Sequence, residues 1–564
     1  MADDMREIIE KYALQNAVKY NAAPQVGAVM GKVMGEHPDL RPRAKEVAPV
    51  VASVLKEVAK MSREEWQSRL EEIAPHLLAE LSEKKEPVRG LPPLKGADGG
   101  VVMRFAPNPN GPPTLGSARG IIINSEYVKR YGGKFILRFD DTDPVNKRPM
   151  LEAYDWYLED CKWLDAVPDE VVVASDRLPK YYEIAEDLIR KGAAYFCSCD
   201  QATFKKHKDA AEPCPHRDQD PELNMELWEG MKEGSFEPGD AVLRIKTDIT
   251  HKDPALRDWA AFRIVAADHP RTGDQYRVWP LLDFESGVED HLLGITHIIR
   301  GKDLMDSERR QGYLYDHLGW DYPITTHWGR IKVHQFGSFS TSALRRALEA
   351  GEYTGWDDPG MPTVRALKRR GIQAEALKKF MTDLGVGETD ISISMDTVYA
   401  ENRKLVDPEA KRRFFVKDPV SVGIVGDLPT VAKAPVHPTK DMGFREILVE
   451  SPVMVARDDF ARMKVGEKIR LKDLCNLKVL SLDPPQVKLI GTDPTQAKEM
   501  KLRIIHWAPK DGVPVKVLRP DGVDEGVGEA GIKEDLGAMV QFERYGFVRI
   551  DSANEKVVAY FAHK

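Results

Sequence analysis

Four residues with metal-binding side chains lie in two close pairs in the middle of the chain. The sequence CSC at residues 197–199 and the sequence CPH at residues 214–216 offer three thiols and one imidazole. Thiolate sulfur and imidazole nitrogen are the ligands that structural zinc prefers, and four of them make a tetrahedral site. The spacings are tighter than the commonest zinc spacings. The pattern predicts a zinc site, with simply buried cysteines as the alternative, formed by Cys197, Cys199, Cys214 and His216.

A second segment has the composition of a phosphate-binding turn. RFAPNPNGPPTLGSARG, residues 104–120, places four prolines, two asparagines and a glycine before the start of a helix. The unpaired N–H groups and the positive dipole end of a helix start suit a phosphate. The segment lacks the glycine spacing of the common nucleotide-binding loops. A stiff connection between a strand and a helix is therefore the alternative.

The elements around this turn predict a parallel sheet. Residues 101–105 form a short apolar run, residues 115–131 have a helical pattern, and residues 134–139 have the pattern of a strand. A strand–helix–strand unit implies parallel strands joined by a right-handed crossover. Ligands of such sheets bind beyond the carboxyl ends of the strands. We therefore expect the turn after Phe105 and the DDTD sequence after Phe139 to face one crevice.

The rest of the chain changes in composition from segment to segment. Residues 1–82 carry valines at three- and four-residue spacing and predict a helical N-terminal module. Residues 83–100 are rich in charge, proline and glycine, and predict a linker. An α/β region at 101–344 is followed by a helical, basic segment at 345–411. Short runs rich in valine and isoleucine then predict an all-β region at 412–564.

Length and composition fit a folded enzyme with several domains. The chain has 564 residues, of which 42% are hydrophobic and 30% are charged, and a prior of roughly 100–200 residues per domain allows about three to five domains. No apolar run reaches the roughly 18 residues of a membrane span, and the acidic start is unlike a signal peptide. Five cysteines cannot form a disulfide framework in so long a chain. We expect a cytoplasmic protein without a membrane segment.

The net charge of −8 gives no general attraction to nucleic acid. RNA binding would therefore depend on local basic patches. Each candidate patch is, on its own, more typical of a solvated helix face. The candidates are Arg345-Arg346, Lys368-Arg369-Arg370 and Lys411-Arg412-Arg413.

Residues 104–120 resemble the HIGH-motif region of glutamyl- and glutaminyl-tRNA synthetases. The resemblance continues, in family order, through LRFDDTDP, WPLLDFESGVEDHLLGITHIIRGKDL, FSTS and EYTGWDDPGMPTVRALKRRGI, which begin at residues 137, 279, 339 and 352. It covers residues 100 to about 425 and is similar to the archaeal type of glutamyl enzyme. It implies a class I Rossmann-type catalytic domain at 101–344 with an acceptor-binding insertion at about 195–275. It also implies a helical connector at 345–411 and a β-barrel anticodon-binding region at 412–564.

The resemblance assigns roles to individual residues. Arg104 and Arg300 are expected to contact the carboxylates of glutamate, and Asp140 its ammonium group, because a guanidinium fork matches a carboxylate. An arginine at position 300 implies glutamate rather than glutamine. Further implied positions are Asn108 and Leu282 for the amino acid, Pro107, Gly116 and Lys332 for ATP, and Thr114, Gly116, Ser117, Ser340, Thr341 and Ser342 for catalysis.

Three departures from the family pattern affect the expected chemistry. Thr114 and Ser117 stand where HIGH has histidines, and Thr341 stands where KMSKS has its second lysine, with Ala343 at a further position that often carries lysine. Leu282 stands where relatives often carry a tyrosine in the amino-acid pocket. Removing one hydrogen-bond donor that stabilises charge in the transition state commonly lowers the rate by about 10²–10³. Neighbouring cations are therefore expected to compensate for the altered residues. The candidates are Arg119, Lys332, His334, Arg345 and Arg346.

The implied reaction is ATP-dependent ligation of glutamate to tRNA(Glu) through a glutamyl-adenylate. ATP with Mg²⁺ is the implied co-substrate, tRNA(Gln) is a possible second acceptor, and a monomer is the family default. A weakened tRNA-binding paralogue and a glutaminyl-tRNA synthetase are alternatives. A tRNA-independent nucleotidyltransferase is a third alternative. The sequence assigns neither a role to the N-terminal module nor the residues that read the anticodon.

Overall fold

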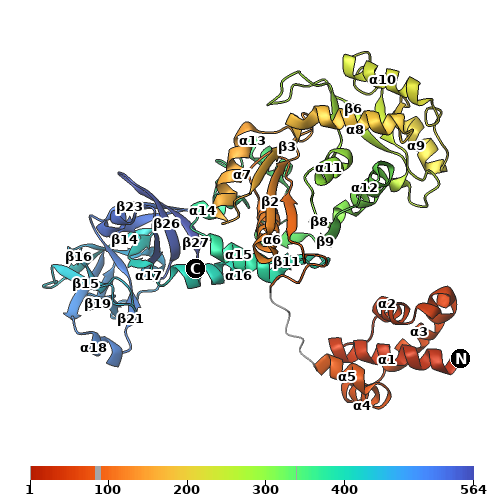
Figure 1. Ribbon diagram of the computed structural model, residues 1–564. Helices are drawn as coiled ribbons and strands as arrows, with labels where there is room; N and C mark the ends of the chain where they lie inside the picture. The colour runs from red at the N-terminus through yellow and green to blue at the C-terminus, as the bar shows by residue number, and fades with distance from the viewer. Residues whose placement is uncertain (1, 83–89, 338–339) are drawn as a thin grey trace. The chain divides into compact units, whose positions relative to one another are not determined.

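The computed structural model describes residues 2–82, 90–337 and 340–564. The chain divides into two compact units, Met1–Arg89 and Gly90–Lys564 (Figure 1). Two sequence predictions fall partly outside the described residues: positions 83–89 of the predicted linker, and Phe339 of the FSTS sequence. No helix of the described residues is long and apolar enough to cross a membrane.

The first unit is built from helices around a long first helix. α1 packs against α2, α3 and α4. The valines that predicted a helix, among them Val47, Val51 and Val54, are buried on one face of α3. Ser62 and Glu65 form a capping box at the start of α4, which satisfies two backbone N–H groups there. The elements are α1 (Ala2–Tyr20), α2 (Val26–Glu36), η1 (Pro38–Arg43), α3 (Ala44–Val58), α4 (Arg63–Ile73) and α5 (Pro75–Ser82).

The second unit begins with the predicted parallel sheet. Its strand order is β3-β2-β1-β8-β9 and every neighbouring pair is parallel. The predicted strand–helix–strand unit is β1, α6 and β2, and α6 packs on β1, β2 and β8. The Rossmann-type fold is thus confirmed. The elements are β1 (Val101–Phe105), α6 (Leu115–Tyr131), β2 (Gly133–Phe139), α7 (Leu151–Trp163), β3 (Glu170–Val173), β8 (His297–Gly301) and β9 (Ile324–Trp328).

An antiparallel sheet of four strands is inserted between β3 and β8. Its order is β4-β5-β6-β7, and it has a hydrophobic core of its own that includes Trp228, Phe262 and Trp279. The elements are η2 (Ala174–Arg177), α8 (Leu178–Arg190), β4 (Ala194–Cys197), α9 (Gln201–Ala210), α10 (Pro221–Glu233), β5 (Val242–Ile245), η3 (Pro254–Leu256), β6 (Trp259–Ile264) and β7 (Val278–Pro280).

Several helices and the short strands β10 and β11 lie next to β8 and β9 in the sequence or follow them. α11 and α12 pack against each other, as do α15 and α16, and β10 pairs with β11. These elements are α11 (Leu282–Leu292), η4 (Lys302–Leu304), α12 (Met305–Leu318), β10 (Ile331–Val333), α13 (Thr341–Glu349), α14 (Val364–Arg369), α15 (Ala374–Leu384), β11 (Ile391–Ile393) and α16 (Met395–Val406).

The C-terminal part is all-β, as its composition predicts. Two seven-stranded sheets are accompanied by the β15–β16 hairpin, and the two sheets have separate cores (Figure 1). The strands are β12 (Lys411–Arg413), β13 (Phe415–Lys417), β14 (Pro419–Val425), β15 (Val431–Pro435), β16 (Phe444–Leu448), β17 (Val453–Ala456), β18 (Lys468–Leu471), β19 (Cys475–Leu482), β20 (Pro485–Gly491), β21 (Arg503–Ile505), β22 (Trp507–Pro509), β23 (Val513–Arg519), β24 (Gly522–Gly528), β25 (Met539–Phe542), β26 (Gly546–Ala553) and β27 (Val557–His563); the helices are α17 (Arg457–Ala461), α18 (Pro494–Glu499) and η5 (Ala530–Asp535).

Two of the basic clusters are not solvated helix faces. Arg370 is buried and donates hydrogen bonds to the carbonyl oxygens of Phe561 and Ala562 at 2.9 and 2.7 Å. Arg412 and Arg413 lie in strand β12 and are buried. The guanidinium groups of these arginines donate hydrogen bonds to carbonyl or carboxylate groups inside the protein. A sequence pattern does not reveal such contacts.

Candidate active site

Three charged side chains meet where three parallel strands end. Arg104 lies near the end of β1, Asp140 directly follows β2, and Arg300 lies near the end of β8. Parallel strands have their carboxyl ends at one edge of the sheet. Together with Asn108 and Leu282, the three side chains line a cavity of about 470 Å³. The structure thus brings together all five predicted amino-acid-binding residues, and the predicted common crevice is confirmed.

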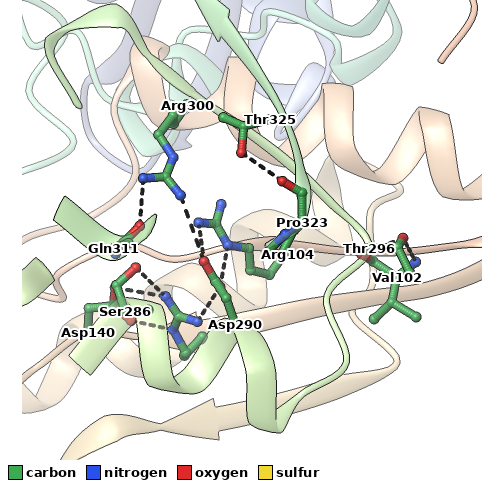
Figure 2. Close-up of polar contacts among 12 residues, drawn as sticks. Val102, Arg104, Asp140, Ser286, Asp290, Thr296, Arg300, Gln311, Pro323 and Thr325 are labelled. Atoms are coloured by element: carbon green, nitrogen blue, oxygen red, sulfur yellow. Dashed lines mark hydrogen bonds and ion pairs between the residues drawn. The ribbon is translucent and has the colours of Figure 1, made fainter. Parts of the chain in front are cut away.

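A buried network of ions holds the two arginines of this cavity (Figure 2). Asp290 on α11 accepts hydrogen bonds from Nε and Nη2 of Arg104 at 2.9 and 3.0 Å. Nη1 of Arg138 donates to the same carboxylate at 2.7 Å, and Nε of Arg138 donates to Asp140 at 2.6 Å. Nη2 of Arg300 lies 3.9 Å from Asp290. The side chains of Arg138 and Asp290 are 0% and 1% exposed, so their charges are shielded from water.

The charge state of Asp290 follows from these contacts. Burial alone would raise the pKa of this carboxyl, but the positive charges of Arg104 and Arg138 lower the pKa to about 2. Asp290 is therefore ionised at neutral pH, as a buried acid must be when it is the counter-ion of several arginines.

Unpartnered polar atoms point to a ligand in the cavity. Nε of Arg300 and Oδ1 of Asn108 are buried and lack a hydrogen-bond partner among the described residues. Nη1 of Arg300 donates to Gln311 at 3.1 Å and Nη2 donates to Tyr322 at 3.0 Å, and each of these nitrogens has a second N–H. Buried polar groups are normally hydrogen-bonded. A polar ligand in this cavity would supply the missing partners.

Glu285 also lines this cavity, and its environment favours the neutral acid. The side chain is fully buried, and both carboxyl oxygens lack a hydrogen-bond partner among the residues described. Burial and the neighbouring charge of Asp140 raise the pKa of Glu285 well above its ordinary value, although Arg138 lies 3.8 Å away and opposes this shift. Glu289 and Tyr181 also face Glu285.

We expect Glu285→Gln to become stabilising relative to the wild type as the pH rises. The folded wild type keeps a proton that the unfolded chain releases, so its free energy of unfolding falls as the pH rises from the ordinary glutamate pKa towards the raised one, by at most about 1.4 kcal/mol per pH unit. Glutamine keeps the shape and stays neutral. Urea unfolding of both proteins between pH 5 and 8 measures the difference.

Glu289→Gln is the matched control for this pH dependence. Glu289 is equally buried on the same helix, but its carboxylate pairs with Nε of Arg177 at 2.6 Å. Glutamine there should lower stability throughout the pH range, because it removes the partner of a positive charge. A pH-independent difference between Glu285→Gln and the wild type would contradict the assignment of Glu285 as a neutral acid.

Sequence reasoning missed Arg138, Glu285 and Asp290. The signal for Arg138 was its position on β2 two residues before Asp140, which directly follows the strand, because side chains two residues apart in extended chain point to one face. Glu285 and Asp290 lie in a helix whose acidic residues resemble a solvated face. Only the structure shows that they are buried, because α11 packs against α12 and β6 and its Asp290 contacts Arg104 of β1 and Arg138 of β2.

The altered HIGH-like residues form the start of α6. Thr114 is the N-cap, and its hydroxyl accepts a hydrogen bond from the backbone N–H of Ser117 at 3.4 Å. Threonine is a good capping residue, so the substitution fits the local structure. A Cβ on Gly116 would lie 3.7 Å from Oγ1 of Thr114, which is an ordinary contact. The protein's own packing therefore does not require glycine at this position.

The FSTS-like segment lies against the same turn. Ser340 caps α13 by accepting from the N–H of Ala343 at 3.2 Å. Asn110 donates to Oγ of Ser342 at 3.3 Å, and a Cβ on Gly111 would lie 2.6 Å from Cγ2 of Thr341. The two altered motifs thus meet, as the resemblance implies for an ATP site.

The cations proposed to compensate for the missing lysine differ in availability. Arg119 is buried and donates to the carbonyl oxygens of Gly329 and Gly385 at 3.1 and 2.7 Å. Two of its donors hold two loops together, while its Nε lacks a partner among the described residues, so Arg119 is less available for phosphate binding than the exposed cations. Lys332 is exposed on β10 and is not one of the described residues that line the cavity.

Pro107 accepts a hydrogen bond from the N–H of Asp140 at 2.9 Å and so positions that residue.

The predicted zinc ligands are gathered in the insertion. The ligand atoms of Cys197, Cys199, Cys214 and His216 all lie within 4.8 Å of one another. Sγ of Cys197 and Sγ of Cys214 are 4.0 Å apart, and Sγ of Cys199 lies 3.4 Å from Nδ1 of His216. Zinc–sulfur bonds of about 2.3 Å in a tetrahedron place two sulfurs about 3.8 Å apart. The donor set and the distances fit zinc.

The surroundings of the cluster also suit a metal. A hydrogen bond with Cys214 lowers the pKa of Cys197 to about 7, and the same contact raises the pKa of Cys214 above its ordinary value, so one thiolate of this pair is accessible near neutral pH without a metal. Nε2 of His216 is hydrogen-bonded to Oγ of Ser198 at 3.1 Å. This contact turns Nδ1 towards the thiols, as partners of metal-binding histidines commonly do.

Comparisons with known proteins follow the same division of the chain. Residues 100–408 match the family described as tRNA synthetases class I (E and Q), catalytic domain. Residues 410–490 and 504–551 match two families that are both described as tRNA synthetases class I (E and Q), anti-codon binding domain. The chain belongs to the class I (E and Q) tRNA synthetases.

Curated relatives in this synthetase family match over essentially the whole chain. A glutamate–tRNA ligase of Methanothrix thermoacetophila is 67% identical over 100% of both chains. A glutamate–tRNA ligase of Methanosarcina acetivorans is 62% identical over 99% of this chain and 98% of its own. A glutamate–tRNA ligase of Thermococcus onnurineus is 46% identical over 100% of both. The predicted membership of a class I synthetase family is confirmed.

Proposed function

We propose that this synthetase activates glutamate with ATP and transfers it to tRNA(Glu). The observation that carries the proposal is the pairing of Arg104 and Arg300 at one cavity with Asp140. Two guanidinium groups match two carboxylates, and one carboxylate matches one ammonium group. Glutamine would offer only one carboxylate to the two arginines. The 46–67% identity to glutamate–tRNA ligases supports the same substrate.

The residues act by positioning and by charge. The α-carboxylate of glutamate attacks the α-phosphate of ATP, pyrophosphate leaves, and a terminal ribose hydroxyl of tRNA then displaces AMP. Each step needs alignment and stabilisation of charge more than covalent help from the protein. Arg104, Asp140 and Arg300 hold glutamate in the cavity. ATP brings Mg²⁺, and its phosphates are expected at the start of α6.

The ATP side of this proposal uses hydroxyls and neighbouring cations. Thr114, Ser117 and residues 340–342 would donate hydrogen bonds to the phosphates, and Gly116 would let the nucleotide approach the backbone. Of the cations predicted to replace the motif lysine, His334, Arg345 and Arg346 stay candidates beside Lys332. Leu282 lines the amino-acid cavity with an apolar surface.

Aminoacylation with labelled glutamate tests the proposal and its rivals. We expect charging of tRNA(Glu), and a parallel reaction with tRNA(Gln) decides whether that tRNA is a second acceptor. Charging with glutamine instead would indicate a glutaminyl enzyme. Tight tRNA binding without charging would indicate a weakened paralogue. Adenylate transfer to an acceptor other than tRNA would indicate a different nucleotidyltransferase.

We also propose that the cysteine–histidine cluster binds one structural zinc ion. The protein purified without chelator should contain about one zinc per chain, and Cys214→Ser should lose it, because a tetrahedral site needs all four ligands. Elemental analysis measures the metal. Thermal unfolding should show a loss of stability in the same variant, since binding energy of a structural zinc contributes to folding.

Cys161→Ser is the control for the zinc proposal. Cys161 is a buried free cysteine outside the cluster, so this variant should keep the zinc content of the wild type. Equal zinc content in Cys214→Ser and the wild type would disprove the assignment. Absence of zinc from the wild type, even after dialysis against zinc, would favour buried free thiols.

A further inference from the structure

One buried carboxylate joins three arginines from three strands. Arg104, Arg138 and Arg300 come from β1, β2 and β8, and Asp290 on α11 contacts all three. Figure 2 shows dashed lines from Asp290 to both Arg104 and Arg300. Its side chain is 1% exposed, and it is not one of the described residues that line the cavity. Asp290 therefore contacts the arginines and not the cavity.

The geometry of these contacts fixes orientation as well as charge. Asp290 uses both oxygens to bind Nε and Nη2 of Arg104, and a two-point contact holds the plane of a guanidinium group. The same carboxylate holds Arg138, whose other donors bind Asp140 and Ser286. The three guanidinium groups all carry a positive charge and lie around one carboxylate, and like charges repel strongly in a buried site. Without a shared anion, the three guanidinium groups would move apart.

We propose that Asp290 is a positioning residue that holds Arg104 and Arg300 at the separation and orientation that fit the two carboxylates of glutamate. The inference rests on the proposed function, in which these two arginines bind the substrate. Asp290 acts through them, because it lies behind the surface that the substrate contacts.

Asp290→Asn distinguishes positioning from a simple effect of charge. The substitution makes the buried cluster more positive, so a pure charge effect would tighten the binding of anionic glutamate. Loss of positioning has the opposite sign, because misplacing a binding group by about 1 Å can cost about 10²-fold. We expect the KM for glutamate to rise about 10- to 100-fold in steady-state aminoacylation, with the KM for ATP within about threefold of wild type.

Glu289→Gln controls for the loss of a buried charge on the same helix. Glu289 is 0% exposed and pairs with Arg177, which is not among the described residues that line the cavity. This variant should lose stability as Asp290→Asn does, but its KM for glutamate should stay within about threefold of wild type. Equal changes of KM in the two variants would overturn the proposal.

Asp290→Glu is a second test that keeps the charge. The longer side chain moves the carboxylate by one methylene and so shifts the arginines without removing their counter-ion. We expect a KM for glutamate raised at least about tenfold. An unchanged or lower KM in Asp290→Asn or Asp290→Glu, beside a raised KM in Arg300→Ala, would disprove this inference alone. An unchanged KM in Arg300→Ala would instead disprove the proposed function.

Discussion

Replacing Arg300 by alanine should raise the KM for glutamate about 100- to 1,000-fold in aminoacylation. Arg300 lines the cavity, is 5% exposed, and has one donor without a partner. A hydrogen bond to a charged group contributes about 1.5–3 kcal/mol, and removal of one partner leaves the other buried and unpaired. Because about 1.4 kcal/mol corresponds to a factor of ten, one such bond together with the cost of the unpaired substrate carboxylate, about 1–3 kcal/mol, accounts for the expected change. Competition between glutamate and glutamine should also show reduced preference for glutamate.

Arg309→Ala is the matched control for this substitution. Arg309 lies on α12, is 54% exposed, and contacts Asp306 at 3.7 Å. Exposed ion pairs contribute little to stability, so both the KM for glutamate and the stability should match the wild type. If Arg300→Ala and Arg309→Ala had the same KM, Arg300 would not be a substrate contact.

Gly133→Ala should destabilise the second unit by more than about 3 kcal/mol. Gly133 begins β2 with a φ of +129°, a conformation that strains any other residue. A Cβ there would lie 1.9 Å from the carbonyl oxygen and 2.7 Å from the nitrogen of Val101. Both are backbone atoms of β1, which pairs with β2 at this position. The strand that carries Arg104 would have to move, so activity should fall with stability.

Replacing the adjacent Gly132 by alanine separates the cost of backbone strain from the cost of a steric clash. Gly132 has a φ of +73°, but a Cβ there meets no atom within 4 Å. Its cost should therefore be only about 1–3 kcal/mol, the penalty of a backbone conformation, φ +73° and ψ 157°, that is essentially restricted to glycine. Urea-unfolding midpoints of the two variants give the comparison. Equal midpoints would show that the contact with Val101 relaxes without cost.

The catalytic sheet could be predicted from the sequence because its signals are local. The predicted strand at 101–105 and helix at 115–131 agree with β1 and α6, and the predicted strand at 134–139 lies within β2. Apolar runs and helical spacing have known periods. The meeting of the two strand ends then followed from the geometry of parallel sheets.

The ion network could not be predicted because it depends on contacts distant in sequence. Asp290 is 186 residues from Arg104 and 152 residues from Arg138. An acidic residue on a helix usually faces water, and no local pattern indicates that Asp290 of α11 contacts arginines of β1 and β2. The same reason explains Arg119 and Arg370, which resemble surface cations but bind buried carbonyl groups.

One short helix also connects the turn before α6 to the last strand of the chain. Just before α14, the carbonyl of Pro362 accepts from the N–H of Leu115 at 3.0 Å. Just after α14, Arg370 binds the carbonyls of β27. A helix rises about 1.5 Å per residue, so this connection is about 10 Å long and too short to bend. The start of α6 and the last strand of the chain are therefore joined through one six-residue helix, so the C-terminal sheet is attached directly to the catalytic sheet's first crossover.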